Sequence, residues 1–271
     1  MKKALALLSV CTMFTPSVFA DSGSEPVKKD PSQTANAAAS HSSASATDSS
    51  LTNDDAKYPW LKNLSGNLTF VTNYVFRGIS QSSNLPATQG SLTYTFPINI
   101  YLNIWGSNVK FLDSHGKNAT VELDTIIGYH NTYGDNFSYD LSFARYNYSG
   151  ARFANYNEFN AVASYYFIQL TLGYSADVFN THQTGTYYNG GINYDIPSTW
   201  IYGVCDVNFL ATLGHYSLPV AAGNSYNDYN IQVTKGFKNY KVAAQWTSTN
   251  GRQHNSPLDG SQLIAQLGVD F

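Results

Sequence analysis

The last ten residues, "QLIAQLGVDF" (Gln262–Phe271), alternate between two kinds of side chain and end in an aromatic ring. One face carries Leu263, Ala265, Leu267 and Val269, and the other carries Ile264, Gln266, Gly268 and Asp270. A period of two predicts a β-strand with two different sides. A terminal Phe that closes such a strand is typical of the signal read by barrel-assembly machinery, so Phe271 is a candidate assembly signal.

The same alternation continues back through the chain to Trp60. In "VELDTIIGYH" (Val121–His130), for example, apolar residues alternate with Glu122 and Asp124. The pattern predicts twelve strands, near 66–77, 88–96, 98–108, 120–130, 137–147, 156–166, 168–176, 186–194, 200–213, 226–235, 239–248 and 262–271. Most are long enough to cross a bilayer at the usual tilt, which takes about 9–11 residues. Strands of soluble domains average about 5–6 residues.

The connections between these segments alternate in length. Those after odd-numbered strands are longer and polar, such as "DVFNTHQTGT" (177–186), and most of those after even-numbered strands are short, such as "GFK" (236–238). This is the outer-membrane pattern. We therefore expect an all-β fold over residues 60–271: a transmembrane antiparallel up-and-down β-barrel of about twelve strands in a Gram-negative outer membrane, with both termini in the periplasm.

The N-terminal region has a different character. Residues 1–20, "MKKALALLSVCTMFTPSVFA", have the charged start, short apolar run and small terminal residues of a secretory signal peptide. A lipoprotein signal ending at Cys11 fits less well, because Val10 is a poor match before an acylated Cys. Residues 21–59 are rich in Ser and Ala and poor in large apolar groups, which predicts a disordered segment. Cys205 is expected in a strand, on its lipid-facing side.

Charge and motifs narrow the function classes. The formal net charge is −3 and no basic patch accumulates, so nucleic acid is not an expected partner. The His residues lack metal-ligand spacing and the chain lacks a recognisable nucleophile motif, so we expect no catalytic residue, metal or cofactor. The expected partners are outer-membrane lipid, the assembly machinery during biogenesis and small hydrophilic solutes. A homo-oligomer is compatible with the sequence.

The polar face of the strands predicts the lining of a pore. Arg77 shares the parity of Asn67, Thr69 and Asn73 at the end of the first strand. The carboxylates on matching faces are Glu122, Asp124, Asp140, Glu158, Asp177, Asp206 and Asp228. Either Arg77 and these carboxylates select permeants, as rings of charged side chains do in pores, or Arg77 forms a structural pair with Glu122 or Glu158. The acidic excess predicts a weak preference for cations.

Several motifs carry a resemblance to a known family. "NYVFRGISQ" (73–81) and "PATQG" (86–90) are followed by "ELDTIIGY", "YDLSFARYNYSG", "YNEFNAVASYYF", "YYNGGINYDIP" and "YNDYNIQV". In this order they resemble the TorF family of porin-like proteins, a proteobacterial outer-membrane family formerly catalogued as a conserved hypothetical protein. The long Ser/Ala-rich leader departs from that pattern, as does "FARYNYSG", which lacks a Pro-Gly often found there. The resemblance implies an outer-membrane barrel with a transport role.

Together these observations predict a porin-like channel for passive diffusion of small hydrophilic solutes or ions. Two alternatives stay open: a non-conducting barrel with a structural, adhesive or surface-interaction role in its loops, and an enzyme at the barrel rim. A barrel of about twelve strands is wider than the 8-strand size that side chains fill and narrower than the 16–18-strand porins. Any pore is therefore expected to be narrow.

Overall fold

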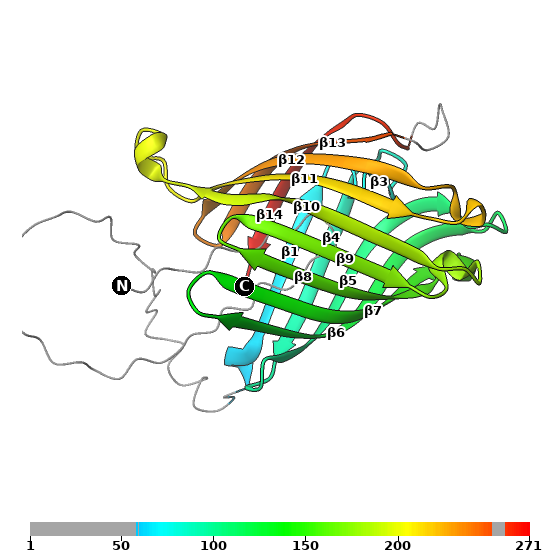
Figure 1. Ribbon diagram of the computed structural model, residues 1–271, viewed down its shortest axis with the longest axis horizontal. Helices are drawn as coiled ribbons and strands as arrows, with labels where there is room; N and C mark the ends of the chain where they lie inside the picture. The colour runs from blue at the N-terminus through cyan, green and yellow to red at the C-terminus, as the bar shows by residue number, and fades with distance from the viewer. Residues whose placement is uncertain (1–57, 59, 251–257) are drawn as a thin grey trace, which may run out of the picture.

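The alternating segments form one closed antiparallel barrel. The computed structural model describes residues 58, 60–250 and 258–271, and in it twelve strands close in the order β1-β14-β13-β12-β11-β10-β9-β8-β7-β6-β5-β4 (Figure 1). The predicted all-β barrel is confirmed. The predicted signal peptide (1–20) and the segment 21–59, apart from Tyr58, lie outside the described residues.

The barrel strands are longer than those of most soluble sheets. They are β1 (Leu64–Val71), β4 (Ala87–Thr95), β5 (Ile100–Leu112), β6 (Asn118–Tyr133), β7 (Phe137–Ser149), β8 (Tyr156–Tyr165), β9 (Ile168–Ser175), β10 (Gly185–Ile196), β11 (Val207–Ser217), β12 (Tyr226–Phe237), β13 (Tyr240–Asn250) and β14 (Gln262–Asp270). Two short strands, β2 (Val75–Phe76) and β3 (Ile79–Ser80), form a separate hairpin. The 3₁₀ turns are η1 (Leu61–Asn63), η2 (Arg152–Ala154), η3 (Val178–Asn180), η4 (Ser198–Trp200) and η5 (Val220–Ala222). Within the described ranges, no helix has the length and apolar character needed to span a membrane.

The barrel closes where its first and last strands meet. β1 pairs with β14 from Asn67↔Asp270 to Val71↔Gln266. At the start of this seam the amide of Gly66 donates to the carbonyl of Phe271 at 2.7 Å, and the amide of Phe271 donates back at 2.9 Å. The ring of Phe271 covers Gly66 so closely that a Cβ there would lie 2.6 Å from it. The role of Phe271 as an assembly signal stays a prediction.

The two faces of the sheet differ as the alternation predicts. On β6, Val121, Leu123 and Ile127 expose 47%, 49% and 50% of their surface, whereas Glu122 and Asp124 on the other face are buried. The outer surface is thus an apolar band around a sheet whose backbone groups pair internally. A sheet in contact with the hydrocarbon of a bilayer needs both an apolar outer surface and backbone groups that pair within the protein.

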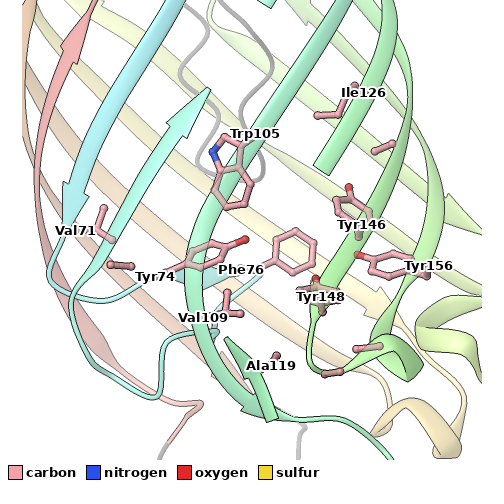
Figure 2. Close-up of a cluster of buried hydrophobic side chains, with 14 of the residues drawn as sticks. Val71, Tyr74, Phe76, Trp105, Val109, Ala119, Ile126, Tyr146, Tyr148 and Tyr156 are labelled. Carbon is pink, nitrogen blue, oxygen red and sulfur yellow. The ribbon is translucent and has the colours of Figure 1, made fainter. Parts of the chain in front are cut away.

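Side chains fill the interior. One buried cluster gathers Val71, Tyr74, Phe76, Trp105, Val109, Tyr146, Tyr148 and Tyr156 among others (Figure 2), and a second contains Ile79, Tyr187, Tyr216 and Tyr226. Many of these residues are tyrosines, which combine a large apolar ring with a polar hydroxyl. The barrel interior is therefore polar in chemistry but closely packed.

One predicted strand, 200–213, begins too early. β10 ends at Ile196, η4 follows, and β11 starts only at Val207. Within the connection, Tyr202, Gly203 and Asp206 have positive φ angles, which an extended strand does not accommodate. The connection extends past the other turns at that end of the barrel (Figure 1). Cys205 is exposed within it, so its predicted position on the lipid-facing side of a strand is wrong.

The first predicted strand, 66–77, ends too late. β1 stops at Val71, and residues 72–86, which include the β2–β3 hairpin, connect it to β4 at Ala87. We call the end of the barrel that carries this segment the loop end, and the end that carries the start of β1 and Phe271 the terminal end.

Leu123→Arg tests the lipid-facing surface. Because Leu123 lies near the middle of β6 on the exposed face, an arginine there is expected to cost about 2–4 kcal/mol of unfolding free energy, measured by urea titration of the protein folded in lipid vesicles. Tyr133→Arg, at the terminal end of the same strand and on the same face, is the matched control and is expected to cost about 0–1 kcal/mol. Equal losses at the two positions would contradict a membrane-spanning orientation of β6.

Candidate functional site

A short hairpin occupies the barrel interior at the loop end. In this inner hairpin (residues 75–80), β2 and β3 pair as Val75↔Ser80 and Phe76↔Ile79. The turn consists of Arg77 and Gly78, with φ angles of 48° and 78°. Positive φ at both positions is the type I′ pattern, for which Gly is well suited and Arg is not. An Arg held in this strained conformation suggests that its side chain has a specific role.

The hairpin side chains are buried among the wall residues. Tyr74 and Phe76 each expose only 6% of their surface, and the ring of Tyr74 lies 5.4 Å from that of Trp105 on β5 (Figure 2). The predicted strand 66–77 would place Tyr74 and Phe76 on the lipid-facing side, opposite Asn73 and Arg77, and this expectation is wrong. Strand parity does not apply to them because the chain has left the wall at Val71.

Polar contacts hold the inner hairpin in place. The Oδ1 atom of Asn73 accepts hydrogen bonds from Ser80 at 2.7 Å and from Ser82 at 3.0 Å. Asn73 also donates to the side chain of Gln262 on β14. The amide of Ser80 donates to the carbonyl of Leu258 at 2.8 Å, which ties the hairpin to the segment before β14.

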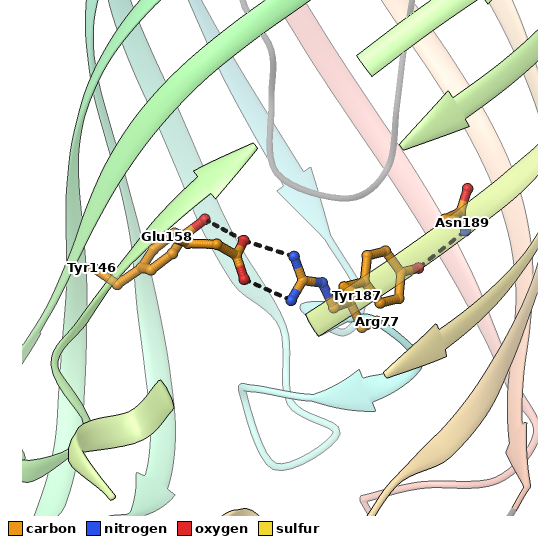
Figure 3. Close-up of polar contacts among 5 residues, drawn as sticks. All are labelled: Arg77, Tyr146, Glu158, Tyr187 and Asn189. Atoms are coloured by element: carbon orange, nitrogen blue, oxygen red, sulfur yellow. Dashed lines mark hydrogen bonds and ion pairs between the residues drawn. The ribbon is translucent and has the colours of Figure 1, made fainter. Parts of the chain in front are cut away.

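At the tip of the hairpin, Arg77 crosses the lumen to Glu158 on β8. Its Nη1 and Nη2 atoms donate to the two carboxylate oxygens at 2.9 and 2.7 Å, a bidentate pair (Figure 3). Around the closed sheet, β8 is five strands from β1 in one direction and seven in the other. The pair therefore connects nearly opposite sides of the barrel.

Aromatic rings surround the guanidinium. Its Cζ atom lies 4.0 Å from the ring centroid of Tyr187, 4.5 Å from that of Tyr216 and 4.6 Å from that of Phe76. The hydroxyl of Tyr146 donates to Glu158 at 3.3 Å. Planar stacking and a bidentate carboxylate are the contacts that suit Arg better than Lys. The site thus holds a guanidinium by charge, shape and ring contacts together.

The interior is acidic overall. Its carboxylates are Glu122, Asp124, Asp140, Glu158 and Asp228, with exposed fractions from 0% to 6%, and among the described residues the buried cation is Arg77. Asp140 accepts a hydrogen bond from Tyr101 at 3.0 Å, and Asp228 accepts one from Tyr187 at 3.1 Å. At the terminal end, Lys241 pairs with Asp270 at 2.9 Å.

Two predicted lining residues lie outside the barrel strands. Asp177 is in the β9–β10 connection, 44% exposed, and accepts a hydrogen bond from the amide of His182 at 2.6 Å. Asp206 is exposed in the β10–β11 connection, so its predicted position in a strand is wrong. The contact between Arg77 and Glu158 matches the structural interpretation of Arg77. Selection of permeants by the remaining carboxylates stays a prediction.

The aromatic neighbours of Arg77 were not among the predicted site residues. Tyr187 and Tyr216 lie on inward-facing positions of β10 and β11, where parity alone would place them in the lumen. The signal that was available is the Arg-Gly dipeptide, which is unusual inside a strand and favours a turn. Within the described part of the chain, no group of three or more His, Cys, Asp or Glu side chains is placed to hold a metal ion.

A closed barrel with an apolar outer band and a polar interior is the architecture of a membrane-spanning β-barrel of the outer-membrane type. Residues 55–264 match the model of a family described as "Bacterial protein of unknown function (Gcw_chp)", and the chain belongs to this family. A search of curated proteins finds no match. The name TorF is not confirmed by these comparisons, so that resemblance stays a prediction.

Solved structures with a similar fold include porins. The KdgM porin is 12% identical, with a TM-score of 0.49, over 76% of this chain and 98% of that one. The NanC porin is 10% identical, with a TM-score of 0.48, over 77% and 98%. OprD from Pseudomonas aeruginosa is 11% identical, with a TM-score of 0.35, over 78% and 66%.

Arg77→Ala tests whether the ion pair holds the hairpin. Removal of one partner leaves the carboxylate of Glu158 buried without its cation, so the unfolding free energy is expected to fall by about 3–5 kcal/mol in urea titrations. A second substitution, Glu158→Gln, removes the carboxylate charge that Arg77→Ala leaves unpaired. The double variant should therefore regain much of the lost unfolding free energy.

Arg152→Ala is the matched control for this experiment, because Arg152 is exposed in η2, outside the barrel strands. A surface change of this kind is expected to cost less than about 0.5 kcal/mol. If Arg77→Ala proved as stable as Arg152→Ala, the ion pair would have no structural role.

Proposed function

We propose that this protein is a porin-like channel of a Gram-negative outer membrane, through which small hydrophilic solutes or ions diffuse passively, with a preference for cations. The observation that carries the proposal is the acidic interior of a lipid-facing barrel, in which, over residues 60–250 and 258–271, five buried carboxylates face the buried guanidinium of Arg77. In this proposal the terminal end faces the periplasm and the loop end faces outward, as in other barrels of this kind.

The arrangement suggests how selection works. Glu158 is neutralised by Arg77, so the remaining field in the lumen comes from Glu122, Asp124, Asp140 and Asp228. Carboxylates along a narrow path of low dielectric constant raise the local concentration of cations and lower that of anions. The inner hairpin narrows the path at the loop end, and solutes pass when it shifts within the lumen.

A second candidate is a non-conducting barrel whose loops interact with a surface or partner. The observation that favours it is the close packing of the interior, where Tyr101 and Tyr187 have no exposed surface. A structural plug would need such packing, and a channel would not. No observation on the described residues favours an enzyme at the rim.

Conductance in planar lipid bilayers separates the two candidates. The purified protein in a KCl gradient is expected to give stable current steps with a reversal potential on the cation-selective side. Replacement of residues 75–80 by a short Gly-Ser linker should enlarge the steps, because it removes the hairpin from the lumen.

Asp206→Asn serves as the control, because Asp206 lies outside the barrel strands, and it should leave the current steps and reversal potential unchanged. A folded barrel that never conducts, with or without its hairpin, would exclude the channel. A clear anion preference would refute the proposed selectivity.

A further inference from the structure

Two of the five lumen carboxylates differ from the others in their surroundings. Glu158, Asp140 and Asp228 each receive a hydrogen bond from an arginine or tyrosine side chain. Both carboxylate oxygens of Glu122 and the Oδ1 atom of Asp124 are buried, and no hydrogen bond of ordinary geometry from the described residues reaches them, although the hydroxyls of Tyr74 and Tyr148 lie beside Glu122. Unsatisfied buried groups are rare in native proteins and call for an explanation.

Glu122 and Asp124 project from the same face of β6. They are two positions apart, so their attachment points are about 7 Å apart along the strand. Their exposed fractions are 0% and 1%. When both are ionised, two negative charges this close and this well shielded from water repel each other and lose the hydration that stabilises them in solution.

The neighbouring strands supply no compensating charge. Ser107 on β5 and Tyr148 on β7 lie opposite Glu122 in the sheet register, and Trp105 and Tyr146 lie opposite Asp124. None of these four side chains is cationic. Arg77 is engaged with Glu158 on β8, so it does not neutralise the pair.

A side chain from a different element also points to a ligand at this position. The hydroxyl of Tyr74, in the segment leading into the inner hairpin, is buried beside Glu122 and makes no hydrogen bond of ordinary geometry to the described residues. It lies beside both carboxylates, and the residue is only 6% exposed. The phenol oxygen therefore adds a neutral oxygen donor to the two carboxylates.

The site of Arg77 shows what a cation requires in this lumen. There a carboxylate and aromatic side chains hold the guanidinium from both sides. Glu122 and Asp124 have the same elements, a carboxylate pair beside Tyr74, Trp105 and Tyr148, but none of the residues that the structure describes supplies a cation to them.

We propose that Glu122, Asp124 and Tyr74 form a binding site for a small inorganic cation. The donors are all oxygens, which suit hard ions such as Na⁺, K⁺, Mg²⁺ and Ca²⁺. A divalent ion balances both carboxylates and is expected to bind more tightly than a monovalent one. The site adds detail to the proposed channel function, because it names the side chains that bind a permeating cation. Passage of the ion through the barrel rests on the proposed function, whereas binding of the ion at this site does not.

The thermal unfolding temperature, Tm, of the full chain tests this site without any conductance measurement. At constant pH and ionic strength, choline chloride is replaced stepwise by NaCl, KCl, MgCl₂ or CaCl₂. A ligand that binds only the folded state raises its stability in a concentration-dependent way. We expect at least one inorganic cation to raise the Tm of the wild-type protein saturably, and the variant Glu122→Gln/Asp124→Asn to show no such shift.

Three further variants make the test specific. Asp140→Asn removes a lumen carboxylate that already accepts a hydrogen bond from Tyr101. This variant should therefore keep the full rise of Tm with cation concentration. If the double variant does not fold, Glu122→Gln alone replaces it in the test. This single variant should show a smaller rise of Tm with the inorganic cation. Tyr74→Phe removes one oxygen donor and should weaken the apparent affinity by about two- to tenfold.

The outcomes separate the site from the channel. A Tm that is the same in choline and in all four inorganic salts, or a response that survives in the double variant, would overturn the site even if the protein conducts. A cation response that depends on Glu122 and Asp124 would support the site even in a barrel that never conducts.

Discussion

Every backbone N–H and C=O group that lies in hydrocarbon must find its partner within the protein, and this constraint organises the whole structure. A sheet meets it only by closing on itself, which here requires β1 to pair with both β4 and β14. Closure then fixes the alternation of side chains, because each strand has one face toward lipid and one toward the lumen. The acidic interior follows from that division, and so does the need to compensate the charges placed there.

The interior combines two properties that usually exclude each other. It is polar enough to hold five carboxylates and packed enough that most of their surface is removed from solvent. Tyrosine reconciles the two, since its ring fills volume and its hydroxyl donates to a carboxylate, as Tyr101 does to Asp140 and Tyr187 to Asp228. The inner hairpin adds Tyr74 and Phe76 to this packing. Arg77 then brings a positive charge across the lumen to Glu158.

The sequence predicts the parts of this structure that depend on period alone. Strand alternation identified the barrel, the number of its strands and the inward side of Glu122, Glu158 and Asp228, because each strand is constrained at every second position by lipid. It could not predict where the chain leaves the wall. Asn73, Tyr74, Phe76 and Arg77 keep the parities of β1 while the backbone turns inward, so these positions resemble a continued strand. The partner of Arg77 is 81 residues away, and only the curvature of the closed sheet brings it within reach.

The seam between β1 and β14 has a consequence for biogenesis. Val71 pairs with Gln266, Thr72 bonds to Ala265, and Asn73, at the entry to the inner hairpin, bonds to Gln262. These contacts join residues almost 200 positions apart, and contacts of such long sequence separation form late and slowly. The edge of β1 that pairs with β14 therefore has no partner within the barrel until β14 has been synthesised and delivered. The hairpin gains its anchor to β14 at the same moment, so barrel closure and the filling of the lumen are completed in a single late step.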